Sequence, residues 1–263
     1  MIDFSDLLQL SKSLRVSEFV ILREYLQILF LNYFYSLPNS HNIVFKGGTA
    51  LRLMHLSNRY SEDLDFTISI KNKDLEKMVF VTIKKMSDQI IEPITVKTLL
   101  TPVGFSQRLS VQTSHSKIPL TIKLDFSQRE RVIFPVQSTI TTTLPVALFS
   151  PITYMDTKEI LAEKFRAITN RHKGRDIYDI WYLLRRNTLI DPVLIQKKLD
   201  YYQEKYDPKK IVEIIQKWNT KDFDQDVRGF LPEKDRNIIP IVISNLLEDL
   251  NPRLEKIITS NIG

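Results

Sequence analysis

The sequence predicts an α+β fold, in which a mixed β-sheet with flanking helices is followed by a C-terminal helical lobe. Two observations indicate this class. Segments with the alternating pattern of half-buried strands recur up to about residue 140, whereas nearly every segment beyond Pro151 has the spacing of an amphipathic helix. Pro145 and Pro151 flank a turn-rich junction. We therefore expect two domains, at 1–150 and 151–263.

The N-terminal part is expected to begin with helices up to about Ser36, one of which opens at Ser17. The expected strands lie at 43–45, 63–70, 94–100, 105–113, 119–127 and 132–140, and helices are expected between them at 49–54 and 71–89. In the C-terminal part, helices are expected at 157–170, 176–186, 192–202, 208–218 and 238–249.

Two carboxylates occupy alternate positions of one expected strand. Asp63 and Asp65 alternate with Leu64 and Phe66, so both acids fall on the polar face of the strand. Residues two apart on a face lie roughly 7 Å apart at their Cα atoms, and oxygen ligands at this spacing can hold hard cations. Two such ions about 4 Å apart would activate a hydroxyl and stabilise a leaving pyrophosphate. For the Asp-x-Asp tripeptide alone, two solvated acids at an exposed strand edge are the favoured interpretation.

A glycine pair precedes the acids, where a short strand meets a helix. Gly47 and Gly48 follow the strand at 43–45, and Thr49 begins the helix. Free backbone N–H groups and the positive end of the helix dipole suit a phosphate, and Thr49 can cap the helix or donate to a phosphate oxygen. A plain tight turn also uses glycine without a ligand. Because the chain has only six glycines, two adjacent ones beside an acid pair favour the phosphate site.

These motifs resemble those of the AbiE-type (AbiEii/AbiGii) toxins of bacterial abortive-infection and toxin–antitoxin systems. The resemblance extends to about Leu184 and implies the nucleotidyltransferase fold of the DNA polymerase β superfamily. It rests on Gly-Gly-Thr-Ala-Leu-Arg-Leu at 47–53, Arg-Tyr-Ser-Glu-Asp-Leu-Asp-Phe at 59–66, Ala-x-Lys at 162–164 and Arg-Asp-x-Tyr-Asp at 175–179.

The resemblance assigns roles to four side chains. It implies that Asp63 and Asp65 bind metal, that Lys164 neutralises the charge of a triphosphate, and that Asp179 orders Lys164 or the metal site. Lysine suits this role as a compact point charge. From the helical pattern alone, Lys164 and Arg166 are solvated cations whose stems cover apolar surface.

A third carboxylate can be sought on another strand. At 120–126, apolar residues alternate with polar ones, and Asp125 lies on the polar face. Asp125 would act as a general base for the attacking hydroxyl or as a further metal ligand. It can equally form a structural ion pair with Lys123 or Arg129, and the sequence leaves the two interpretations open.

The helix expected at 176–186 begins with an acid and follows a basic loop. Asp176 is explained as a first-turn acid that caps the helix or compensates its dipole. Arg171, Lys173 and Arg175 form the richest local basic run, which suits phosphate or nucleic acid, although a solvated loop between helices has the same composition.

The amino-acid composition excludes several classes of protein but does not identify a particular class. The formal charge is +6, from 37 Lys and Arg against 31 Asp and Glu, which is compatible with a polyanionic partner. The chain has no cysteine, which excludes disulfides, thiolate zinc sites and cysteine nucleophiles. The most apolar stretch, at 19–37, is interrupted by Arg23 and Glu24, so neither a membrane span nor an export signal is expected. We expect a cytoplasmic protein.

The expected activity is that of a Mg²⁺-dependent nucleotidyltransferase, with Mn²⁺ as the alternative ion. Such an enzyme transfers a nucleoside monophosphate from a nucleoside triphosphate to a hydroxyl and releases pyrophosphate. The resemblance implies a tRNA 3′ end as acceptor, growth inhibition as the result and a cognate antitoxin as partner. Because Lys164 and Asp179 follow the domain boundary, we expect the active site in a cleft between the domains.

Two other functions remain open. One keeps the fold and transfers the nucleotide to a protein hydroxyl or to a small molecule such as an aminoglycoside. The other is an inactive module that binds a nucleotide or a partner. Retention of both Asp63 and Asp65 argues against the inactive module, because degeneration would lose the metal ligands first.

Overall fold

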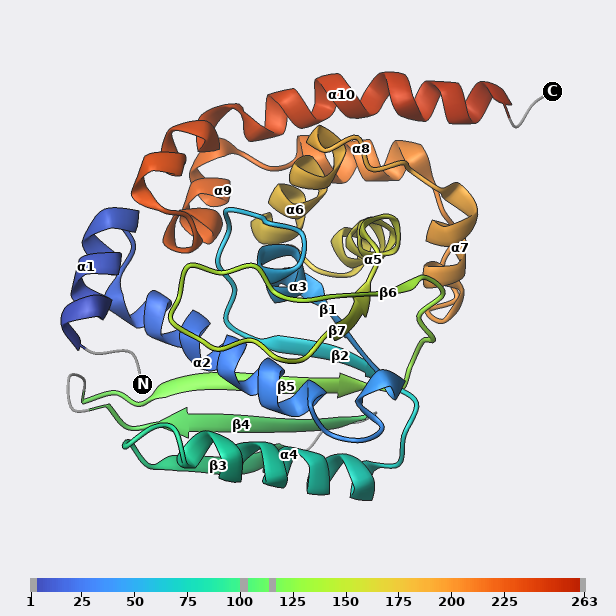
Figure 1. Ribbon diagram of the computed structural model, residues 1–263. Coiled ribbons are helices and arrows are strands. Elements are labelled where there is room, and N and C mark those ends of the chain that lie inside the picture. The colour runs from blue at the N-terminus through green and yellow to red at the C-terminus, as the bar shows by residue number, and fades with distance from the viewer. Residues whose placement is uncertain (1–3, 100–103, 114–116, 261–263) are drawn as a thin grey trace. The chain divides into compact units, whose positions relative to one another are not determined.

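The computed structural model describes residues 4–99, 104–113 and 117–260 (Figure 1). The chain divides into two compact units, Met1–Met155 and Asp156–Gly263. The last residue of the strand expected at 94–100, Leu100, lies outside the described residues.

The first unit is built on a mixed sheet. The described residues form seven strands in the order β3-β4-β5-β2-β1-β7-β6. Strands β2 and β5 pair in parallel, as do β1 and β7, and the other neighbouring strands are antiparallel. The strands are β1 (Ile43–Lys46), β2 (Leu64–Ile68), β3 (Ile94–Leu99), β4 (Phe105–Val111), β5 (Leu120–Ser127), β6 (Pro135–Ser138) and β7 (Ile152–Met155).

One face of the sheet is apolar and packs against α2 (Glu18–Tyr35). This helix begins after Ser17, whose hydroxyl accepts a hydrogen bond from the Val20 amide. The ring of Phe34 lies 5.7 Å from that of Phe66 on β2 and 6.0 Å from that of Phe126 on β5. This aromatic cluster forms the centre of the core.

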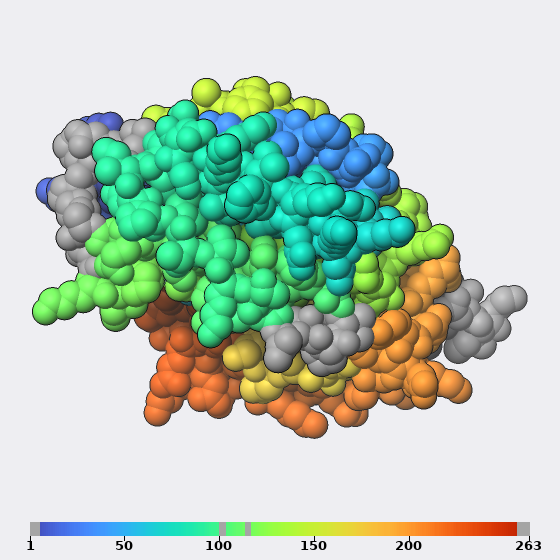
Figure 2. Space-filling view, turned by 90° about the horizontal axis from the view of Figure 1, so that it is seen from below, coloured from blue at the N-terminus to red at the C-terminus, as the bar shows by residue number. Residues whose placement is uncertain are grey.

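The other helices of this unit are shorter or lie nearer the surface. The helix α4 packs against α2, and both lie over the same face of the sheet (Figure 1). Beside α4, the edge strand β3 is exposed at the surface of the unit (Figure 2). The helices are α1 (Phe4–Leu14), the 3₁₀ turn η1 (Ser40–Asn42), α3 (Gly47–Leu53) and α4 (Asn72–Ser87).

The second unit consists of helices in the part that the structure describes. Pro192 and Pro208 stand at the first helical positions of α7 and α8, where a missing N–H costs nothing, and the preceding aspartates cap these helices. The helices are α5 (Thr157–Asn170), α6 (Gly174–Arg185), α7 (Pro192–Asp200), α8 (Pro208–Gln216), α9 (Thr220–Val227) and α10 (Ile239–Ser260), with 3₁₀ turns η2 (Arg228–Phe230) and η3 (Glu233–Ile238).

Three elements differ from the sequence-based expectation. Strand β7 lies directly after Pro151, where no strand was expected, and is held by its pairing with β1 and β6. Helix α9 was not expected, since it has few apolar residues. Helix α10 was expected to end at 249 but continues through Pro252, because Leu250 and Leu254 on either side of the proline are both buried.

Candidate active site

The structure brings two of the predicted carboxylates together. Asp65 on β2 and Asp125 on β5 are direct partners in the parallel register, so their side chains leave the same face of the sheet. Neighbouring strands lie about 4.8 Å apart. Asp65 and Asp125 are half-buried, and Asp63, immediately before β2, is exposed. The acids therefore lie on the face opposite the aromatic core.

Gly47 lies against one of these acids. Its φ of +78° is in the left-handed region, and a β-carbon built on it would collide with Asp65 Oδ2. Lys46 is the register partner of Asp65 in the antiparallel pairing of β1 with β2. Glycine is thus required at this turn both by the backbone conformation and by the nearness of the carboxylate.

Gly48 lies close to a different neighbour. Its β-carbon would lie 2.5 Å from Arg59 Nη2 and 2.9 Å from Ser61 Oγ. Arg59 is buried, and its Nη1 donates to the Tyr60 carbonyl at 2.9 Å. The loop before Asp63 consequently packs directly on the first turn of α3.

Helix α2 and Arg52 hold the same loop. Gln27 on α2 donates to the carbonyls of Ser61 and Glu62 at 3.1 Å and 3.0 Å. Arg52 lies over the ring of Tyr60, with its Cζ 4.0 Å from the ring centroid. These contacts fix the backbone that leads into the acid pair.

Thr49 is hydrogen-bonded to the backbone of Asp63 instead of capping the helix. Its hydroxyl is buried and donates to the backbone carbonyl of Asp63, and Lys46 occupies the N-cap position. The sequence led us to expect a cap or a phosphate donor at Thr49. The observed hydrogen bond ties the start of α3 to the start of β2 and so positions Asp63.

Asp125 forms one of the ion pairs that the sequence left open. Lys123 Nζ lies 2.7 Å from Asp125 Oδ2, whereas Arg129 Nε donates to Ser127 Oγ at 3.3 Å. Burial of the ammonium group would lower the pKa of Lys123, but the hydrogen bond and charge of Asp125, followed by the charges of Asp63 and Asp65, raise it above its ordinary value. Lys123 therefore interacts with all three acids.

The residues present fit a hard divalent cation. Within the described residues, no group of three or more histidine, aspartate or glutamate side chains is arranged to hold a metal. Mg²⁺, however, commonly binds through one or two carboxylates together with substrate phosphates and water. Asp63 and Asp65 would supply such a donor pair, and Gly47 lies against Asp65. A cation at this pair would depend on the nucleotide for further ligands.

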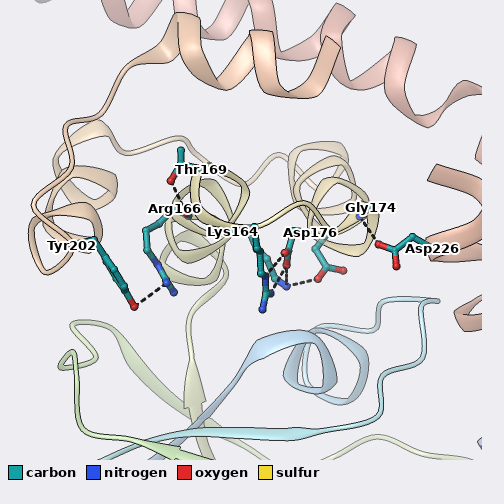
Figure 3. Close-up of polar contacts among 9 residues, drawn as sticks. Lys164, Arg166, Thr169, Gly174, Asp176, Tyr202 and Asp226 are labelled. Atoms are coloured by element: carbon teal, nitrogen blue, oxygen red, sulfur yellow. Dashed lines mark hydrogen bonds and ion pairs between the residues drawn. The ribbon is translucent and has the colours of Figure 1, made fainter. Parts of the chain in front are cut away.

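In the second unit, Lys164 lies in a buried ion-pair cluster (Figure 3). Its Nζ is 2.7 Å from Asp176 Oδ1 and 2.7 Å from Asp179 Oδ2. Arg171 Nε is 2.7 Å from Asp176 Oδ2. The side chain of Lys164 is 10% exposed, and those of the two aspartates are 1% and 0% exposed. Lys164 is therefore a buried paired cation, which corrects the solvated interpretation that the helical pattern alone gave.

Asp176 is a cluster residue that the sequence analysis missed. We interpreted it as a helix cap, but it contacts Lys164 and Arg171 and makes no capping hydrogen bond. Burial would raise the pKa of Asp176, but Lys164 and Arg171 outweigh burial and hold it well below its ordinary value. The spacing to the buried Ile180 and Leu183 places Asp176 on the core stripe of α6, and this signal could have identified it.

The three residues of the basic run have different surroundings. The side chain of Arg171 is 59% exposed and bound to Asp176, while Arg175 Cζ lies 4.5 Å from the ring centroid of Phe230. Lys173 is exposed. The ring of His172 stacks on Trp218 with 3.8 Å between centroids. Arg166, expected to be solvated, donates to the Tyr202 hydroxyl at 3.0 Å.

The chain shares its fold with solved structures. MenT4, a nucleotidyltransferase toxin from Mycobacterium tuberculosis H37Rv, is 16% identical with a TM-score of 0.69, and the match covers 95% of this chain and 90% of that one. JHP933 from Helicobacter pylori is 21% identical with a TM-score of 0.54, and the match covers 94% of this chain and 99% of that one. No curated protein matches the chain. The fold is that of a nucleotidyltransferase.

A family model defines the chain more narrowly. The model described as nucleotidyl transferase AbiEii toxin of a type IV toxin–antitoxin system matches residues 30–257. The chain belongs to this AbiEii family of nucleotidyltransferase toxins, and the resemblance found in the sequence is confirmed. Membership implies a nucleotide substrate and an antitoxin partner. Across the part of the chain that the structure describes, no helix has the length and apolar character needed to span a membrane.

Proposed function

We propose that this toxin transfers a nucleoside monophosphate from a nucleoside triphosphate to the 3′-hydroxyl of a tRNA. The hydroxyl oxygen bonds to the α-phosphorus, the bond from that phosphorus to the bridging oxygen breaks, and pyrophosphate leaves while the hydroxyl gives up its proton. The observation that carries the proposal is the pairing of Asp65 with Asp125 across β2 and β5, with Asp63 beside them and Gly47 against Asp65.

In this proposal Asp63 and Asp65 hold Mg²⁺, or Mn²⁺ in its place. When bound, the divalent ion supplies positive charge that acidifies the acceptor hydroxyl and offsets the charge of the leaving pyrophosphate. Asp125 accepts the hydroxyl proton or becomes a further metal ligand. In either role, its carboxylate must give up the ion pair with Lys123 and bind the hydroxyl or the metal ion instead. Lys123 then remains beside the acids as a counter-charge.

The glycine turn and the Lys164 cluster have distinct proposed roles. Gly47 and Gly48 let a phosphate approach the backbone, and Thr49 acts through its hydrogen bond to the Asp63 carbonyl. Lys164, oriented by its ion pair with Asp179, neutralises triphosphate charge.

The basic run of Arg171, Lys173 and Arg175 is proposed as a contact for nucleic acid. Arg171 would have to leave Asp176 to do so, whereas Lys173 is exposed and makes the simplest test of this contact.

The experiment is a labelling assay with each α-labelled nucleoside triphosphate, Mg²⁺ and total cellular RNA. We expect label in an RNA of tRNA size, lost on treatment with a chelator and restored by Mg²⁺. If label appears only in protein or only in a small molecule, the acceptor is that molecule and not a tRNA. The proposal fails if no nucleotide yields a labelled product under conditions in which the protein is folded.

A further inference from the structure

Three cations lie side by side on the sheet face that carries the acids. In the antiparallel pairing of β3 with β4, Lys97 is the register partner of Arg108, and in the pairing of β4 with β5, Arg108 is the partner of Lys123. Direct cross-strand partners point to the same face, with Cβ atoms about 4.5–5.5 Å apart. Lys97, Arg108 and Lys123 thus form a cationic row that crosses three strands.

Within β3, β4 and β5, the positive charge on this face is confined to this row, and Lys46 on β1, the register partner of Asp65, is a further cation on the same face. The neighbouring row on one side is Thr95, Ser110 and Thr121, and the row on the other side is Leu99, Ser106 and Asp125. Neither of these rows contains a cation. Each of the three strands therefore contributes one positive charge at the same level of the sheet.

Two members of the row have no local counter-charge. Lys97 and Arg108 are exposed, and among the described residues neither forms an ion pair. Like charges directly opposite each other on neighbouring strands destabilise a sheet. Lys123, the third member, forms an ion pair with Asp125 and interacts electrostatically with Asp63 and Asp65. A folded chain that keeps Lys97 and Arg108 exposed and without an ion pair presents these two charges to an external polyanion.

We propose that the cationic row binds the phosphodiester backbone of the acceptor RNA next to its reactive end. This inference rests on the proposed function and adds to it the path of the acceptor. The row runs from the edge strand β3 to Lys123, which is ion-paired with Asp125, so phosphates bound along the row place the end of the RNA at the acids. Phosphate contacts of this kind fix position without reading sequence.

A binding experiment on the full chain tests the row directly. A fluorescent tRNA is titrated without nucleoside triphosphate or divalent ion, so that no turnover occurs. We expect Lys97→Glu/Arg108→Glu to weaken binding by at least about tenfold, and Lys97→Ala/Arg108→Ala to reduce the salt dependence of log K by about 1 for each cation removed. The matched control is Lys77→Glu/Lys84→Glu, which makes the same charge change at exposed positions of α4.

Steady-state labelling separates this inference from the proposed function. If both hold, the row variant raises the KM for RNA while kcat and the KM for the nucleotide stay at wild-type values. If wild-type protein labels RNA but the row variant behaves as the α4 control does, the row is excluded as an RNA-binding site and the proposed function stands. If no RNA is labelled although binding depends on the row, the proposed function falls and the row remains a binding site for RNA.

Two results of the binding assay would overturn the inference. One is equal loss of affinity in the row variant and the α4 control, which would indicate only a general effect of net charge. The other is row-dependent binding of polyglutamate as tight as that of tRNA, which would make an acidic protein the partner.

Discussion

Gly47 and Asp65 lie so close together that a β-carbon on the glycine would overlap the carboxylate. The pair links the first residue of α3 to one of the three acids. Because of this contact, a shift of the backbone at Gly47 displaces the Asp65 carboxylate, and a shift of the carboxylate displaces Gly47.

Gly47→Ala should therefore damage both stability and activity. The left-handed φ of +78° costs a non-glycine residue roughly 1–3 kcal/mol, and the new methyl group must displace the Asp65 side chain. We expect a lower midpoint of thermal unfolding and loss of nucleotide transfer. Gly229→Ala is the matched control, because a β-carbon there meets nothing within 4 Å. Equal behaviour of the two variants would show that the close approach is unimportant.

Removal of the Lys164 ammonium group should destabilise the second unit strongly. Asp176 and Asp179 would remain buried, and Asp179 would lose the ion pair to Lys164. We expect Lys164→Met to lower the free energy of unfolding by about 3–5 kcal/mol, the usual cost of breaking a buried pair. Chemical denaturation measures this, with Lys217→Met as an exposed lysine control.

A second substitution tests the cause of that loss. Asp179→Asn in the Lys164→Met background should recover part of the stability, because it removes the buried charge left behind. No recovery in the double variant would argue against the ion pair as the source. Activity of the Lys164 variants should be compared only where the protein is folded.

The expected pH dependence follows from Asp176. Its pKa in the folded protein lies below the ordinary value of 3.8, so the unfolded chain binds its proton first as the pH falls. The stabilising contribution is complete above the ordinary value and is lost as the pH drops below it. We expect the difference in unfolding free energy between wild type and Asp176→Asn to shrink from about pH 6 to about pH 3. A constant difference across that range would contradict the ion-pair assignment.

Part of the site could be predicted because local patterns determine it. Alternation along β2 and β5 places Asp65 and Asp125 on polar faces, and both lie there in the structure. Their direct pairing could not be predicted, since the parallel register depends on contacts far apart in sequence. The same holds for the row of Lys97 and Arg108, which single-strand patterns do not reveal.

Other features were missed because tertiary packing overrides local signals. Asp176 has the position of a first-turn acid, yet the buried Lys164 makes it part of a core cluster. Strand β7 has only four residues after Pro151 and exists through its pairing. Pro252 suggests the end of a helix, but burial of Leu254 beyond it keeps α10 continuous.

The most direct measurement is a crystal structure of the protein with Mn²⁺ and a non-hydrolysable nucleoside triphosphate, using the anomalous signal of the metal. We predict an anomalous peak coordinated by carboxylate oxygens of both Asp63 and Asp65, with the triphosphate completing its ligands. A metal ion bound to the nucleotide but away from these two side chains would contradict the central claim.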